Sequence, residues 1–170
     1  KIPSQISATN AFKLGIENIN NEFFLFWEHD HLFKTGIDWN IINDCISCGA
    51  RMIRFNRNRN PLEVNKTFIN DLKNIENNIE LVDIRNHKDD FLRTNHYSNG
   101  PFISETEFCK RLWKDVNFSF PNWNGTFGGF IEGPVNQKMM ADEFNLPRRK
   151  FLEKYPIYLY GGLNKEPIVF

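Results

Sequence analysis

The chain has 170 residues, and its 21 Lys and Arg balance 21 Asp and Glu, so the formal net charge is zero. This length predicts one domain with a sizeable core. The charge balance argues against a dedicated nucleic-acid-binding protein or a membrane-surface protein, both of which usually carry a basic excess. Three cysteines give no even disulfide framework, and no apolar stretch is long enough for a transmembrane segment.

The chain begins with an amphipathic segment and an aromatic run. Residues 7–19 place Phe12 and Ile16 at helical spacing, with Ser7 as the expected N-cap. Phe23–Trp27 is apolar without alternation, which predicts a strand buried on both faces. A helix that leads into a buried strand is half of a βαβ unit, yet no strand precedes this helix. We therefore expect a truncated domain.

Two acids and two histidines follow this run directly, as Glu28-His29-Asp30-His31. Open α/β sheets bind ligands outside the carboxyl ends of their strands. In an extended chain Glu28 and Asp30 point to the same side, so both carboxylates can face one cation or one polar ligand. Solvated acids at an ordinary strand end explain the same spacing.

A second helix is predicted over residues 39–48, with Asp38 as its N-cap and Gly49 at its C-terminal end. Cys45 and Cys48 form a C-x-x-C near the end of this helix, whereas redox pairs usually lie at a helix N-terminus. A zinc site would need about four ligands, and no second pair exists. We therefore expect two buried structural cysteines.

Residues 51–56 predict a strand, and a basic, Asn-rich loop follows at 57–61. Arginines at 51, 54, 57 and 59 are typical of a phosphate-binding patch. Because the rest of the chain is neutral, a solvated loop or a local anion clamp explains them better than an RNA-binding arm.

The remaining sequence predicts helices and strands in alternation. In chain order we expect a helix at 66–77, strands at 79–84 and 91–97, a turn at 98–101, a helix from a capping box at 104–107 to residue 113, a loop at 118–129, a helix through residue 144 and a strand at 154–161. Trp123 in the loop suits stacking on a sugar ring, or packing in the core. Glu132 lies where a helix dipole favours an ionised carboxylate, which suits a general base or simple helix-end electrostatics.

The order of these motifs resembles nucleotide-sugar glycosyltransferases of the GT-A fold. The resemblance rests on Ala8-Thr9-Asn10, the aromatic strand, the acid-x-acid Glu28-His29-Asp30 and the later Phe130-Ile131-Glu132-Gly133-Pro134. Within that fold the chain looks most like the inverting family-two enzymes and the small chlorella-virus-type glycosyltransferases. The resemblance covers most of the chain. It implies an α/β domain with a mixed sheet flanked by helices, and transfer from a nucleotide sugar, with UDP-sugar favoured, to a glycan or another hydroxyl acceptor.

The resemblance also implies roles for individual residues. Asp30 would bind Mn²⁺ or Mg²⁺, and Glu28 would contact the ribose or a metal-bound water. His31 would add a nitrogen ligand, which suits Mn²⁺, or would simply be hydrogen-bonded at the strand end. Glu132 would be the catalytic base that deprotonates the acceptor. The donor and acceptor would be lined by Asn10, Asn99 and Trp123.

Two departures from the family pattern affect this interpretation. Family members carry a strand–helix–strand section before the first helix here, and many carry a histidine after the last strand. Without these parts we expect weak donor binding. The alternatives are a non-catalytic nucleotide- or carbohydrate-binding module on the same scaffold, and a magnesium-dependent nuclease-like α/β domain. The sequence does not fix the location, and a cytoplasmic one is favoured. The glycosylation sequons at 65, 117 and 124 would matter only in a secretory compartment.

Overall fold

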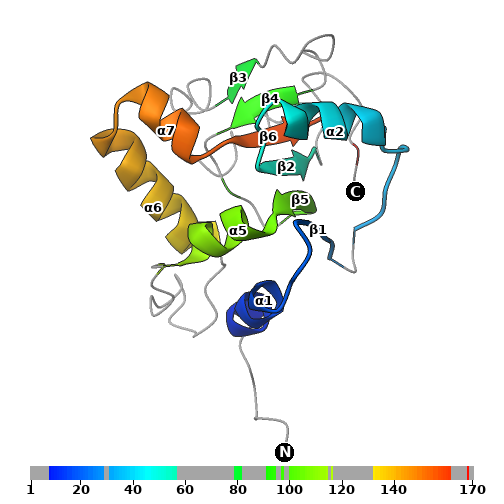
Figure 1. Cartoon of the computed structure of the whole chain (residues 1–170), viewed down its shortest axis with the longest axis horizontal. Coiled ribbons are helices and arrows are strands. Elements are labelled where there is room, and N and C mark those ends of the chain that lie inside the picture. The colour runs from blue at the N-terminus through cyan, green and yellow to red at the C-terminus, as the bar shows by residue number, and fades with distance from the viewer. Residues whose placement is uncertain are drawn as a thin grey trace, which may run out of the picture.

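A computed structural model describes residues 8–28, 31–56, 79–81, 91–94, 97, 100–114, 116, 132–161 and 168. The elements are α1 (Ala8–Glu17), β1 (Phe23–Phe26), α2 (Trp39–Ser47), β2 (Met52–Phe55), β3 (Ile79–Leu81), β4 (Phe91–Thr94), β5 (Phe102–Glu105), α5 (Thr106–Trp113), α6 (Glu132–Asn145), α7 (Arg148–Lys154) and β6 (Ile157–Tyr160) (Figure 1). The predicted helix at 66–77 and the predicted loops at 57–61 and 118–129 lie outside these residues. In the described part of the chain no helix is long and apolar enough to cross a membrane.

The six described strands form one mixed sheet in the order β1-β5-β2-β6-β4-β3. β2 and β6 are parallel, and the other neighbouring pairs are antiparallel. Because β1 and β2 both run antiparallel to β5, which lies between them, β1, β2 and β6 all point the same way. Their carboxyl ends meet at one end of the sheet, which we call the carboxyl end, and the opposite end is the amino end. The predicted α/β class with a mixed sheet is therefore confirmed.

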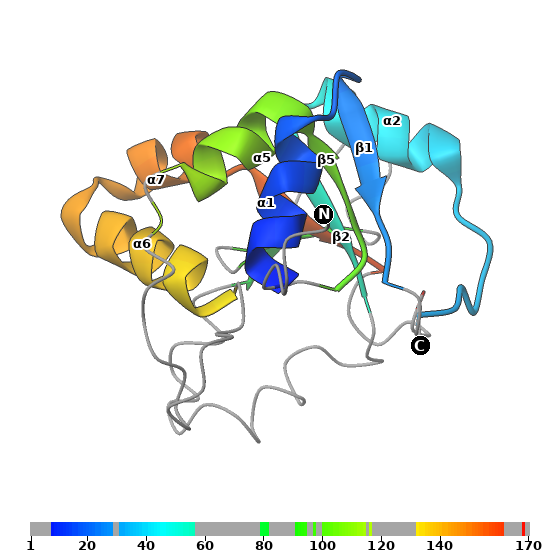
Figure 2. The same ribbon diagram turned by 90° about the horizontal axis from the view of Figure 1, so that it is seen from below.

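Helices cover both faces of this sheet. One face packs against α1, α5, α6 and α7 through a cluster that includes Met52, Phe102 and Ile157. The other face packs against α2 through a cluster that includes Ile53 and Phe55. Consecutive residues of β2 thus enter opposite cores, as the pleat of a strand requires. α1 lies beside α5, and α6 beside α7 (Figures 1 and 2).

The prediction that the first strand is buried on both faces is wrong. β1 pairs only with β5 in the described sheet, and Leu25 is 44% exposed. Its residues nevertheless contact both cores. Phe24 and Phe26 pack against the first cluster, with their rings 5.9 and 5.1 Å from the ring of Phe102, and Phe23 packs against the second. Alternate residues that pack on opposite faces therefore give an apolar run without alternation, although no residue of β1 is fully buried.

The predicted capping box at 104–107 is also wrong. Ser104 belongs to β5, and its hydroxyl donates to the carbonyl oxygens of Arg51 and Glu105. α5 begins at Thr106, and the Glu105 side chain makes no capping hydrogen bond. β5 pairs with β1 on one side and with β2 on the other, and these nonlocal ladders outweigh the local helix-start signal.

The second helix forms as predicted. The Asn40 amide donates to Oδ1 of Asp38 at 3.0 Å, so Asp38 is the N-cap of α2. Gly49 follows the helix with a φ of 101°, a backbone conformation that favours glycine. The prediction for the two cysteines is half right, because Cys45 is buried while Cys48 is exposed.

The last predicted strand begins later than expected. Residues 148–154 are helical as α7, and β6 starts at Ile157. α7 has Arg149 and Lys150 paired with Glu153 at helical spacing, a local signal of an exposed helix. The predicted strands at 79–84 and 91–97 are confirmed in part as β3 and β4, while residues 82–84, 95 and 96 lie outside the described residues.

Candidate functional site

The carboxyl end of the sheet is held together by backbone hydrogen bonds after three strands. The amide of Asn56, the residue after β2, donates to the carbonyl of Tyr160 at 2.9 Å. The amide of Ile168 donates to the carbonyl of Asn56 at 2.9 Å, and the Ile168 carbonyl accepts from the amide of Lys34 at 2.9 Å. Asn56 is 1% exposed. These hydrogen bonds therefore link the chain after β1, the ends of β2 and β6, and residue 168 at the carboxyl end of the sheet.

A tight turn follows β1 at this end of the sheet. The His31 amide donates to the Glu28 carbonyl at 3.1 Å, and the Trp27 indole N–H donates to the His31 carbonyl at 3.0 Å. These two bonds hold Glu28 and His31 close together. The alignment of Glu28 with Asp30 stays a prediction. Asp30 itself lies outside the described residues.

The turn brings one carboxylate and one imidazole together. His31 Nδ1 lies 3.4 Å from Glu28 Oε2, with the His31 side chain 3% exposed and the Glu28 side chain 38% exposed. Carboxylate oxygen and imidazole nitrogen are both ligands that Mn²⁺ accepts, and the separation suits two neighbouring ligands of one cation. No group of three or more His, Cys, Asp or Glu is found among the residues described, so this pair would supply only part of a coordination shell.

Glu132 lies in the first turn of α6, and α6 contacts Tyr97. Asn136, one helical turn after Glu132, hydrogen-bonds both backbone groups of Tyr97. Its Oδ1 accepts from the Tyr97 amide at 2.8 Å and its Nδ2 donates to the Tyr97 carbonyl at 2.9 Å. Residues four apart share one helix face, so the face that carries Glu132 is turned toward Tyr97.

Tyr97 is a buried phenol next to α6. Its side chain is fully buried, and no described residue hydrogen-bonds its hydroxyl. Burial raises the pKa of Tyr97 well above its ordinary value, and the charges of Cys109, Glu132 and Glu28 raise it further while Arg54 lowers it.

The predicted site residues are therefore brought together in part. Glu28 and His31 are in contact, and Glu132 lies one helical turn before Asn136, which holds the Tyr97 backbone. Asn10 is in the first turn of α1, and its side chain is outside the described part. The positions of Asp30, Asn99 and Trp123 are likewise outside the described residues.

Sequence reasoning missed two residues of this neighbourhood, Tyr97 and Arg54. Tyr97 fell within a predicted strand, and Arg54 was noted only as one of four arginines. No local pattern marks either residue, because only the packing of the β4–β5 connection onto α6 and β2 brings them together.

We compared the chain with family models, curated proteins and solved structures, and no match was found in any of the three.

Proposed function

We propose that this chain transfers a sugar from a nucleotide diphosphate sugar, with UDP-sugar favoured, to an acceptor hydroxyl with inversion, in a GT-A-like domain. The observation that carries the proposal is the Glu28–His31 pair at the carboxyl end of a mixed sheet. Glu132, one helical turn before the Asn136 that holds Tyr97, would supply a second carboxylate for catalysis. The resemblance of the motifs at 8–30 and 130–134 supports this assignment over other chemistries that use acids at a strand end.

Glu28 and His31, with Asp30 by resemblance, would hold Mn²⁺ or Mg²⁺. When bound, the cation neutralises negative charge on the diphosphate leaving group. Burial of the His31 ring beside Trp27, whose indole holds the turn, fixes its orientation before any ligand arrives. A side chain that is already ordered loses little conformational entropy when a ligand binds.

Glu132 would act as the base. It lies in the first turn of α6. The acceptor oxygen bonds to the anomeric carbon on the face opposite the leaving group. The bond from that carbon to the diphosphate oxygen breaks, the hydroxyl proton passes to Glu132, and the nucleoside diphosphate leaves with the electron pair.

Thermal denaturation with UDP-glucose, UDP-galactose and GDP-mannose, each with and without MnCl₂, tests donor binding. A ligand at a hundred times its Kd stabilises the native state by about 2.7 kcal/mol. For a domain of this size that corresponds to roughly 5–11 °C in Tm, at about 2–4 °C per kcal/mol. We expect such a shift with one donor, only with Mn²⁺, and its loss in Asp30→Ala and His31→Ala.

The division of roles is tested with Glu132→Gln. This variant should keep the donor-dependent shift and lose sugar transfer to an acceptor, while the surface variant Glu17→Gln should keep both. Equal loss of donor binding in Glu132→Gln and Asp30→Ala would overturn the assignment of Glu132 as base. Donor binding without any transfer by the unaltered chain would favour the non-catalytic binding module. No shift with any donor would refute donor binding by this chain.

A further inference from the structure

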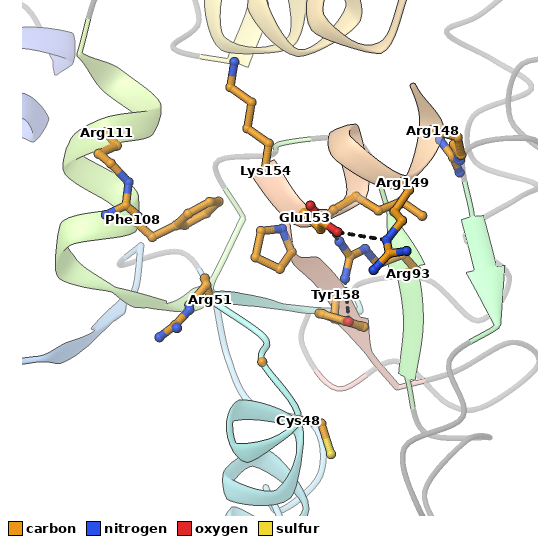
Figure 3. Close-up of a pocket in the computed structure, with 13 residues that line it drawn as sticks. Cys48, Arg51, Arg93, Phe108, Arg111, Arg148, Arg149, Glu153, Lys154 and Tyr158 are labelled. Carbon is orange, nitrogen blue, oxygen red and sulfur yellow. Dashed lines mark hydrogen bonds and ion pairs between the residues drawn. The ribbon is translucent and has the colours of Figure 1, made fainter. Parts of the chain in front are cut away.

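A pocket with a volume of about 910 Å³ lies at the amino end of the sheet (Figure 3). Six of its lining residues are cations, while Glu153 is its one lining acid among the described residues; the cations are Arg51, Arg93, Arg111, Arg148, Arg149 and Lys154. The whole chain has no net charge, so this excess of cations among the lining residues is local. A local excess of positive charge attracts anionic ligands.

The cations come from separate parts of the fold. Arg51 precedes β2, Arg93 lies in β4, Arg111 lies in α5, and the other three belong to α7. Arg93 pairs in register with Tyr158, near the start of β6, so the pocket lies opposite the end that carries Glu28 and His31. The pocket is therefore separate from the proposed glycosyltransferase site.

Arg93 supplies a fixed positive charge in this pocket. Its guanidinium donates to the carbonyls of Leu152 and Tyr155, at the C-terminal end of α7, and to the hydroxyl of Tyr158. The guanidinium carbon lies 4.6 Å from the centre of the Tyr158 ring. These partners are neutral and supply only partial negative charge, and no described carboxylate pairs with Arg93. A half-buried cation without an acid is stabilised when an anion binds beside it.

Four of the other five cations have acidic partners that an anion can displace. Arg51 lies 3.4 Å from Glu105, and Lys154 lies 2.6 Å from Asp142, with each cation about half exposed. Exposed ion pairs contribute about 1 kcal/mol or less, so a multiply charged ligand competes with them. No described carboxylate pairs with the exposed Arg111.

We propose that this pocket binds a small ligand that carries two or more phosphate groups. Five of the six cations are arginines, whose planar guanidinium donates two parallel hydrogen bonds to one phosphate. Cations on four elements can surround such a ligand, whereas a single phosphate would reach few of them. The volume lies within the range of small-molecule sites.

Calorimetric titration with inorganic pyrophosphate, at low salt and in EDTA, tests the proposal. EDTA removes the metal-dependent contribution of the proposed donor site, so a failure here is distinguishable from a failure there. We expect binding at one site that weakens as salt is added. Arg51→Gln and Arg111→Gln should each weaken it about tenfold, since each removes one charge-assisted contact. Lys13→Gln, an equal loss of charge on the exposed part of α1, should leave the Kd unchanged.

Sedimentation with neutral vesicles, with and without a phosphoinositide, distinguishes the source of the phosphates. Pyrophosphate binding alone indicates a free ligand such as a nucleotide, and additional phosphoinositide-dependent sedimentation indicates a lipid headgroup. The proposal is overturned by three results. These are no binding of either probe, pyrophosphate binding that both arginine variants retain at full strength, and tighter binding of poly-glutamate than of pyrophosphate. Both arginines are exposed, so circular dichroism should show that their variants fold normally.

Discussion

Replacing Gly161 with alanine should strongly destabilise the fold, because two costs add at this position. Gly161 has a φ of 117°, and a Cβ there would lie 2.8 Å from Asn56 Cβ and 3.1 Å from Ile168 Cγ1. The backbone conformation costs a non-glycine residue about 1–3 kcal/mol. The overlap costs about 1–3 kcal/mol more, because Asn56 is buried and its amide and carbonyl are both hydrogen-bonded, so it cannot move away. We expect a loss of roughly 2–6 kcal/mol from a typical total of about 5–15 kcal/mol.

Two other glycines separate these costs. Gly49 has a φ of 101° with no atom within 4 Å of an added Cβ, so Gly49→Ala carries only the conformational cost. Gly15 lies inside α1 with open space and no unusual φ, so Gly15→Ala should stabilise by up to about 1 kcal/mol. Urea denaturation followed by tryptophan fluorescence measures all three free energies of unfolding. Equal losses in Gly161→Ala and Gly49→Ala would refute the steric part of the argument.

Three further measurements test the described core. Under native conditions an aromatic disulfide reagent should modify the exposed Cys48 quickly, while the buried Cys45 and Cys109 react only after unfolding; fast reaction of all three would contradict the packing. Burial raises the pKa of Cys109 to about 12 and also raises the pKa values of Cys45 and Tyr97. These groups keep their protons in the native state and lose them near pH 9–10 when unfolded. Their contribution is therefore fully present below about pH 8.5, and the free energy of unfolding should fall as pH rises further, by up to about 1.4 kcal/mol per pH unit and group; a flat alkaline profile in urea titrations would exclude this. Asn136→Ala removes both hydrogen bonds to the Tyr97 backbone and should cost about 1–3 kcal/mol, whereas an unchanged urea midpoint would show that they are dispensable.

Local signals in the sequence predict the local parts of the fold. α2 is predicted correctly because local features set both of its ends. Asp38 caps its first turn, and Gly49 adopts a positive φ just after its last turn. β5 is missed because its identity as a strand depends on β1 and β2, whose residues are distant in the chain. The sequence at Ser104 matches a helix-start pattern, but Ser104 lies in β5 and the helix begins at Thr106.

The same distinction applies to the two proposed sites. Glu28 and His31 are three residues apart, so the strand-end cluster is visible in the sequence. The proximity of Glu132 to Tyr97 depends on how α6 packs, which no spacing reveals. Of the arginines noted in the sequence, Arg51 lines the pocket at the amino end of the sheet, whereas Arg54 lies near Tyr97. The pocket's other cations come from elements whose packing the sequence does not show.

The position of β6 in the sheet has a consequence for folding. β6 is the last described strand in the chain, yet it lies between β2 and β4 and is the only strand that joins the group β1-β5-β2 to the pair β4-β3. During synthesis those two groups therefore have no shared ladder until residues 157–160 emerge from the ribosome. A sheet closed by such long-range contacts has a high contact order and folds slowly. Until then the partly made chain exposes unpaired strand edges, which makes it a substrate for chaperones and prone to aggregation.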